Sequence, residues 1–368
     1  MCSIDNSPHF RYNKQKYQQG VSMNSLFGNI KESNIISVFE AFLARKIQSR
    51  RNVADTTGLS FVTVSKVADA LVELKILRQY NLTADSLSRR SRVLVTKQYY
   101  WLGVYTFSPD MFIFTAYDLS FKERYRFQRR PVYTDFPDHA INSFILRTRD
   151  FIKKNRIKIP RCIGLGVLVP GSYDKAKDKV TDSHINHFSA FRFKKILSEY
   201  FPEEIIRVSS AYLCCANELR WEMNDDDKMF SFFIDKDSIK GAYITKQYVP
   251  EIKNSGLITT STGKTLNVLA NRPRDIDPFF NDISNIIFTL EHTIPLTKTA
   301  VGGNLYPRND AVATVLHHVL SEKYHKAMRI PPDVISVDVY QKATQNITRE
   351  IRTSWFKEKI IHQIPCNT

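Results

Sequence analysis

Residues Ser49–Gln79 read SRRNVADTTGLSFVTVSKVADALVELKILRQ, and this stretch decides the fold of the N-terminal part of the chain. Ser49 is placed to cap a short helix, which Gly58 ends because glycine readily takes the left-handed conformation. Ser60 is placed to cap the next helix. The apolar residues of that helix recur at helical spacing: Val64, Val67, Ala68 and Leu71. Two short helices joined by a glycine turn predict a helix-turn-helix.

A further helix precedes this pair, and a β-hairpin is expected after it. The apolar residues that follow Ser33 fall on one helical stripe: Ile35, Val38, Phe39 and Phe42. Ile76–Arg78 is expected to open a wing, whose far strand lies near SLSRRSR at Ser86–Arg92. We therefore predict a winged helix-turn-helix domain over residues 25–96, preceded by an N-terminal arm over residues 1–24.

The distribution of charge points to an anionic partner. The chain holds 53 Lys and Arg against 37 Asp and Glu, which gives a net charge of +16. Residues 1–100 hold 15 basic and 7 acidic side chains, a surplus of +8, so half of the net charge lies in little more than a quarter of the chain. A basic module of this kind is typical of nucleic-acid binding, although basic surfaces also keep proteins soluble.

The stretch Ser49–Ser65 resembles the winged helix-turn-helix of bacterial repressors, whose pattern is S-R-x-x-L-A-x-x-x-G-L-S-x-x-T-V-S, with Val53 where Leu is usual. The resemblance implies that the second helix of the pair enters the major groove of double-stranded DNA, while nearby basic residues neutralise phosphates. The residues expected to contact DNA are Arg50, Arg51, Ser60, Phe61, Thr63, Ser65, Lys66, Arg89, Arg90 and Arg92. The outer face of the first turn is expected to carry Phe61, Thr63, Ser65 and Lys66.

Residues 97–368 alternate strands and helices and predict an α/β body. The expected strands are 99–107, 111–119, 125–133, Ile163–Val169, 205–210, 229–235 and 241–246. The expected helices are Asp138–Lys154, Ala190–Tyr200, Leu213–Trp221, Phe279–Leu290 and Val312–Leu320, with Trp355 and Phe356 anchoring one more at the C-terminus. The run Ile163–Val169 is apolar throughout, as in a strand that is buried on both faces.

The order of motifs in this body, behind that helix-turn-helix, resembles the ROK family of repressors, open reading frames and sugar kinases. The motifs are VLVPGSYD (Val167–Asp174), SAYLCCANEL (Ser210–Leu219) and AVGGNL (Ala300–Leu305). The resemblance covers nearly the whole chain. It implies an actin-like, hexokinase-like (ribonuclease H-like) body of two α/β lobes, one over about 97–218 together with the C-terminal helix and one over about 219–340. It also implies a homodimer or homotetramer and is compatible with the binding of a sugar-like effector.

Departures from the family pattern argue against catalysis. Family kinases open the body with D-x-G-G-T, but here Tyr105 stands at the acidic position, and the chain has only 12 Gly, about 3% against a typical ~7%. The catalytic Asp of the family is replaced in Val208–Ala211, and its zinc loop is eroded near Gly256 and Leu257. We therefore expect no enzymatic activity, no cofactor and no metal. If an effector binds, the expected residues are Gly171, Ser209 and Ser210.

The remaining sequence features indicate a cytoplasmic, nucleoid-associated regulator. No apolar run reaches the roughly 18 residues of a membrane span. The five cysteines lack C-x-x-C spacing, and Cys214 and Cys215 are expected to pack in a core. The leading hypothesis is a sequence-specific, repressor-type DNA-binding protein. The alternatives are a regulator that acts only through protein contacts and an active sugar kinase.

Overall fold

The computed structural model of the 368-residue chain describes most of its residues. The described ranges are 30–45, 47–82, 91–96, 99–108, 110–132, 137–181, 188, 191–234, 239–247, 249, 251–252, 276–303 and 309–361. The chain divides into two compact units, one of residues 1–99 with 354–368 and one of residues 100–353. Each unit is described by itself below.

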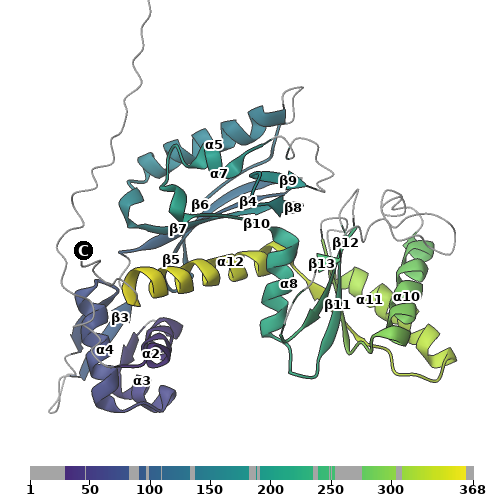
Figure 1. Cartoon of the computed structure of the whole chain (residues 1–368), viewed down its shortest axis with the longest axis horizontal. Coiled ribbons are helices and arrows are strands. Elements are labelled where there is room, and N and C mark those ends of the chain that lie inside the picture. The colour runs from purple at the N-terminus through teal and green to yellow at the C-terminus, as the bar shows by residue number, and fades with distance from the viewer. Residues whose placement is uncertain are drawn as a thin grey trace, which may run out of the picture. The chain divides into compact units, whose positions relative to one another are not determined.

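Over its described residues before Tyr99, the first unit contains three α-helices and a small antiparallel sheet (Figure 1). The helices are α2 (Glu32–Ala44), α3 (Arg50–Thr57) and α4 (Phe61–Glu73). The strands are β1 (Ile47–Ser49), β2 (Leu77–Leu82) and β3 (Ser91–Thr96), in the order β1-β3-β2. Strands β2 and β3 pair antiparallel, so the hairpin expected after the third helix is present. Three helices followed by such a hairpin have the element order of a winged helix-turn-helix.

The end of the chain belongs to this first unit as well. The residues from Ser354 onward group with it, and they include the π-helical turn η5 (Phe356–Ile361). The ring of Phe356 stacks on that of Phe39 in α2, with centroids 3.8 Å apart, and Lys357 lies 3.5 Å from Glu32. These residues were expected to belong to the body, because the aromatic partner of Phe356 lies more than 300 positions away in the sequence.

The second unit begins with a five-stranded sheet in the order β10-β7-β4-β5-β6. Its strands are β4 (Trp101–Phe107), β5 (Phe112–Asp118), β6 (Glu123–Arg129), β7 (Cys162–Val169) and β10 (Ile206–Ser210). The helices against this sheet are α5 (Pro137–Lys154), α7 (Phe193–Leu197) and α12 (Val339–Trp355), with α12 on the face opposite to α5 (Figure 1). Short elements η2 (Ile159–Arg161), β8 (Ser172–Asp174), β9 (Lys179–Thr181) and η3 (Glu203–Ile205) join them. A cluster of buried aromatic rings under α5 fills the core: Tyr105, Phe107, Phe112, Phe114 and Phe144.

A second five-stranded sheet follows in the order β13-β12-β11-β14-β15. Its strands are β11 (Lys228–Ile234), β12 (Ile239–Thr245), β13 (Glu251–Ile252), β14 (Lys298–Gly302) and β15 (Asp333–Val337). The accompanying helices are α8 (Ala211–Trp221), α10 (Ile276–Thr293) and α11 (Asn309–Lys326) (Figure 1). Two sheets that each carry helices confirm the predicted two-lobed α/β body.

Most predicted body elements are confirmed to within a few residues, and one is shorter than expected. The helix predicted over Ala190–Tyr200 is reduced to α7, because Ser198–Phe201 turn back onto the helix through backbone hydrogen bonds. Strands β14 and β15 and most of helix α12 were not predicted.

Candidate nucleic-acid interface

Side-chain caps and one glycine fix the turn between α3 and α4. The Asn52 N–H donates to Ser49 Oγ at 3.1 Å, and the Thr63 N–H donates to Ser60 Oγ at 3.1 Å. Gly58 ends α3 in the left-handed conformation, with φ of +69°. These are the two caps and the glycine turn that the sequence predicted. Each cap satisfies a backbone donor that the helix itself leaves unpaired.

The inner faces of the three helices form a closed apolar core. The residues predicted to face it are buried: Ile35, Val38, Phe39, Phe42, Val53, Ala54, Val64, Val67, Ala68 and Leu71. Several of them are fully inaccessible, which sets the rotation of α4 about its own axis. The opposite face of α4 therefore points to solvent or to a binding partner.

Two apolar side chains stand out on that opposite face, at the start of α4. Phe61 is 56% exposed and Val62 is 63% exposed, and Lys66 is exposed one turn further on. Phe61 and Lys66 thus lie where the sequence placed them. Val62 was missed, although it lies off the helical stripe of Val64, Val67 and Leu71, and that spacing was the available signal.

The two hydroxyls expected beside Phe61 are placed differently. Thr63 is half-buried, and its Oγ1 lies 2.9 Å from Ser60 Oγ, so these two hydroxyls satisfy each other. Ser65 is also half-buried, and its Oγ is inaccessible and has no hydrogen-bond partner among the described residues. The expectation that both project from the outer face was therefore too simple. The apolar Phe61 and Val62 dominate the open surface of the first turn, and the basic Lys66 follows one turn further on.

The two arginines of α3 have different surroundings. Arg51 is exposed, but Arg50 is only 20% exposed and forms a forked ion pair with Asp69 of α4 at 2.5 and 3.3 Å. Arg50 was expected to contact a phosphate; in this structure it joins α3 to α4 and neutralises an acidic group on the outer face of α4. This pair could not be predicted from the sequence, because its members are 19 residues apart.

The hairpin carries a basic and aromatic pair that sequence reasoning overlooked. Arg78 and Tyr80 on β2 are exposed, and the Arg78 guanidinium lies 4.7 Å from the centre of the Tyr80 ring. Their i, i+2 spacing in a strand places both on one face, which was the available signal. Arg92 lies in β3 opposite Asn81. Arg89 and Arg90 lie outside the described residues.

The three residues expected around an effector come together at the ends of two parallel strands. Ser210 of β10 lies in register with Val169 of β7, and Gly171 follows two residues later. The Ser210 hydroxyl is buried and accepts a bond from the Leu213 N–H at 3.5 Å, as the N-cap of α8. Ser209 hydrogen-bonds the thiol of Cys214. Each hydroxyl thus has one hydrogen-bond partner within the protein, and Ser210 Oγ acts there as an acceptor.

Tyr105, which the predicted resemblance places at the acidic position of the family kinases, is a core residue, as are several residues of α8. Tyr105 is 1% exposed, packs 4.9 Å from the Phe114 ring, and has its pKa raised by burial. Cys214 and Cys215 are buried, as expected, and burial raises the pKa of the Cys214 thiol to about 12. Glu218 is 3% exposed; its Oε1 accepts a bond from Arg349 at 2.7 Å, and burial raises the pKa of its carboxyl.

The described residues hold no group of three or more His, Cys, Asp and Glu side chains that could bind a metal ion. The region of Gly256 and Leu257, where the family zinc loop would lie, is outside them. Among the same residues, no helix combines the length and the apolar character that crossing a bilayer requires.

No protein-family model and no curated protein matches the sequence. Solved structures do match. The crystal structure of a ROK family transcriptional regulator, a homologue of the E. coli MLC protein, has a TM-score of 0.59 at 12% identity and covers 90% of this chain and 99% of its own. The chain has the ROK fold.

Other ROK-fold structures match over a shorter part of the chain. A ROK family protein from Streptococcus pneumoniae TIGR4 in complex with sucrose has a TM-score of 0.51 at 11% identity and covers 70% of this chain and 99% of its own. A glucokinase from Balamuthia mandrillaris in complex with glucose has a TM-score of 0.50 at 8% identity and covers 68% and 94%. The predicted resemblance to ROK proteins is thus confirmed as a fold, and this fold occurs in both a regulator and a kinase.

Proposed function

We propose that this protein is a DNA-binding transcriptional regulator of ROK ancestry. The observation that carries the proposal is the extent of the structural match. The regulator matches 90% of the chain, whereas the sucrose-bound protein and the glucokinase match 70% and 68%. Each of these structures is itself covered almost in full. The share of the chain that the regulator matches beyond the other two structures has the size expected for the N-terminal helices and hairpin. These elements have the architecture of a DNA-reading module.

The surface of α4 supports a specific mode of reading. The exposed Phe61 and Val62 would meet the C5-methyl groups of thymines in the major groove, as apolar side chains do at A·T pairs. Lys66 and Arg51 would neutralise phosphates beside that groove, and Arg78 would do so from the hairpin. We therefore propose an AT-rich site in which apolar contacts specify the sequence and basic residues set the affinity.

We propose that the body mediates oligomerisation of the regulator and has no catalytic role. A homodimer or homotetramer would present two modules to a roughly palindromic site with half-sites one or two helical turns apart. The buried Tyr105 would leave no acidic group for a metal at the start of the first sheet, which argues against phosphoryl transfer. With the Ser209 and Ser210 hydroxyls engaged internally, a simple hexose would bind weakly.

Binding to the DNA upstream of the protein's own gene tests the proposal. The F61A/V62A variant should lose about tenfold in affinity for a bound fragment and little for random duplex of equal length, since apolar contacts to bases carry the sequence preference. The matched control is M328A/I330A, which removes two apolar side chains that are 96% and 88% exposed in the other unit. Wild-type affinity and preference in F61A/V62A would contradict the proposal, provided that the variant folds.

A salt titration separates the basic residues from the apolar pair. R51A should weaken binding to all duplexes alike and lower the salt slope by about one, because each phosphate contact releases about one counterion. F61A/V62A should leave that slope unchanged. A slope that is identical in wild type and R51A would remove Arg51 from the interface.

A further inference from the structure

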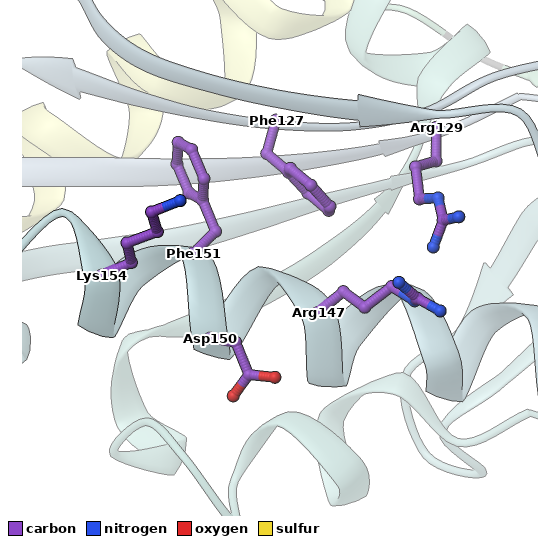
Figure 2. Close-up of a pocket in the computed structure, with 6 residues that line it drawn as sticks. All are labelled: Phe127, Arg129, Arg147, Asp150, Phe151 and Lys154. Atoms are coloured by element: carbon purple, nitrogen blue, oxygen red, sulfur yellow. The ribbon is translucent and has the colours of Figure 1, made fainter.

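A groove of about 390 Å³ opens at the edge of the first sheet, between strand β6 and helix α5 (Figure 2). It belongs to the second unit and uses none of the residues proposed to contact DNA. Six residues line it: Phe127, Arg129, Arg147, Asp150, Phe151 and Lys154. Two come from the C-terminal half of β6 and four from α5, so the groove lies between that half of the edge strand and the helix.

The floor of the groove is aromatic and incompletely covered. Phe127 is half-buried; its ring stacks on the buried Phe144 at 5.5 Å and on the half-buried Phe151 at 5.3 Å. Phe127 thus already stacks with two neighbouring rings, and its partial exposure leaves part of it open toward the groove. Such a floor suits an aliphatic side chain or the edge of an aromatic one.

The rim of the groove is cationic. Arg129 and Arg147 lie at one end and Lys154 at the other, and all three are exposed (Figure 2). In the described part of the chain, none of the three has an ion-pair partner within 4.0 Å. Asp150 points away from the aromatic floor and lies 3.7 Å from Arg149 instead (Figure 2). Two cationic ends separated by an apolar floor complement a segment with carboxylates on either side of an apolar residue.

Strand β6 also offers its backbone. It is the last strand in the sheet order, and within the described ranges it pairs only with β5. Natural edge strands carry charges to prevent pairing with other chains, but that role does not require aromatic residues open to solvent between the charges. An extended peptide could pair with this edge and place alternate side chains over the groove.

We propose that this groove docks an extended acidic segment of a partner protein, with an apolar side chain seated on Phe127 and Phe151 between carboxylates that meet Arg129, Arg147 and Lys154. A second copy of this chain is a poor occupant, because the groove is cationic and the chain carries +16. The edge strand favours a peptide over a nucleic acid, since only a peptide backbone continues a sheet ladder. The inference goes beyond DNA binding and places a partner on the body.

The test uses the full chain without DNA and a fluorescein-labelled peptide of about ten residues in which every second residue follows the order Glu, Leu, Glu, Phe, Glu, with Ser or Thr between them, so that the acidic and apolar side chains share one face of the extended peptide. Fluorescence anisotropy should report binding that R129E/R147E weakens by about tenfold or more. The matched control is K195E/K326E, which makes the same change of charge at exposed lysines outside the groove; it should leave binding within about twofold. F127A should weaken binding with no change of charge, which separates the apolar contact from simple attraction.

Three results would overturn the docking proposal. One is equal binding by R129E/R147E and wild type. Another is equal loss in K195E/K326E, which would mean that only net charge matters. The third is tighter binding of a single-stranded oligonucleotide of equal charge through the same arginines, which would make the groove a nucleic-acid site. Circular dichroism of each variant shows whether it is folded. If F127A does not fold, K154E provides a further test of the cationic rim.

Discussion

Adding one methyl group at Gly164 should destabilise the body severely, because α12 lies directly on β7 at this point. A Cβ built on Gly164 overlaps the Cγ2 methyl of Ile351, with Cβ and Cγ1 of the same side chain at 3.4 Å. Isoleucine in a helix is restricted to essentially one χ1 rotamer, so that methyl cannot swing away. The helix or the strand must therefore move. Gly166, two residues on, provides the comparison, because its nearest neighbour is the flexible Cδ1 of Ile347 at 2.9 Å.

The expected magnitudes follow from these contacts. Overpacking of a rigid core costs about 1–3 kcal/mol, so G164A should lie near the upper end at about 3 kcal/mol and G166A near the lower end at about 1 kcal/mol. Ile351 is 2% exposed, and I351A alone should cost about 2–5 kcal/mol through the cavity that it leaves. In G164A/I351A the new methyl enters that cavity, so the double variant should be more stable than the sum of the two losses by about 2 kcal/mol.

Urea titrations followed by tryptophan fluorescence measure these differences, with the slope of each transition compared to show that it is unchanged. I351V is the control for the rescue. Valine keeps both γ carbons, so it retains the overlap, and G164A/I351V should show no relief. Full additivity of G164A and I351A, or equal relief by I351V, would refute the packing argument.

Three further predictions concern single positions. G58A should cost about 1 kcal/mol in thermal or chemical unfolding, because alanine is strained at φ +69° although the space beside it is open; G58N should cost less. Cys214, with a thiol pKa of about 12, should react with a disulfide reagent at about pH 8 only after unfolding, and reaction at the rate of a free thiol would contradict its burial. Hydrogen bonding to Lys298 lowers the pKa of Asp227. The ionised carboxylate therefore stabilises the fold above its unfolded pKa, and this contribution is lost as the pH falls through its folded pKa. The D227N variant should be less stable at neutral pH, and its stability should depend less on pH in the acid range.

The parts of the fold that the sequence predicted correctly are those with local signals. Ser49, Gly58 and Ser60 act within a few residues of themselves, so the bounds of α3 and α4 could be derived from capping alone. The apolar run Ile163–Val169 likewise lies within β7. Helix α12 was missed because its apolar stripe is sparse and includes the buried polar residues Asn346, Thr348 and Arg352. Such a stripe is sufficient only because the glycines of β7 let the helix approach closely.

The candidate interfaces were less accessible to sequence reasoning, because their character depends on pairs of distant residues. Arg50 is an ordinary phosphate ligand in the repressor pattern, but Asp69, 19 residues later, reduces its availability. On the body, by contrast, tertiary packing creates a cationic site rather than removing one. Arg129 and Arg147 are unremarkable surface residues in the sequence, and only the packing of α5 along β6 places them at one end of an aromatic floor. On both units, therefore, the charge that a partner would meet is set by tertiary contacts that select which arginines remain unpaired, and this is why the tests substitute Arg51, Arg129 and Arg147 rather than any arginine.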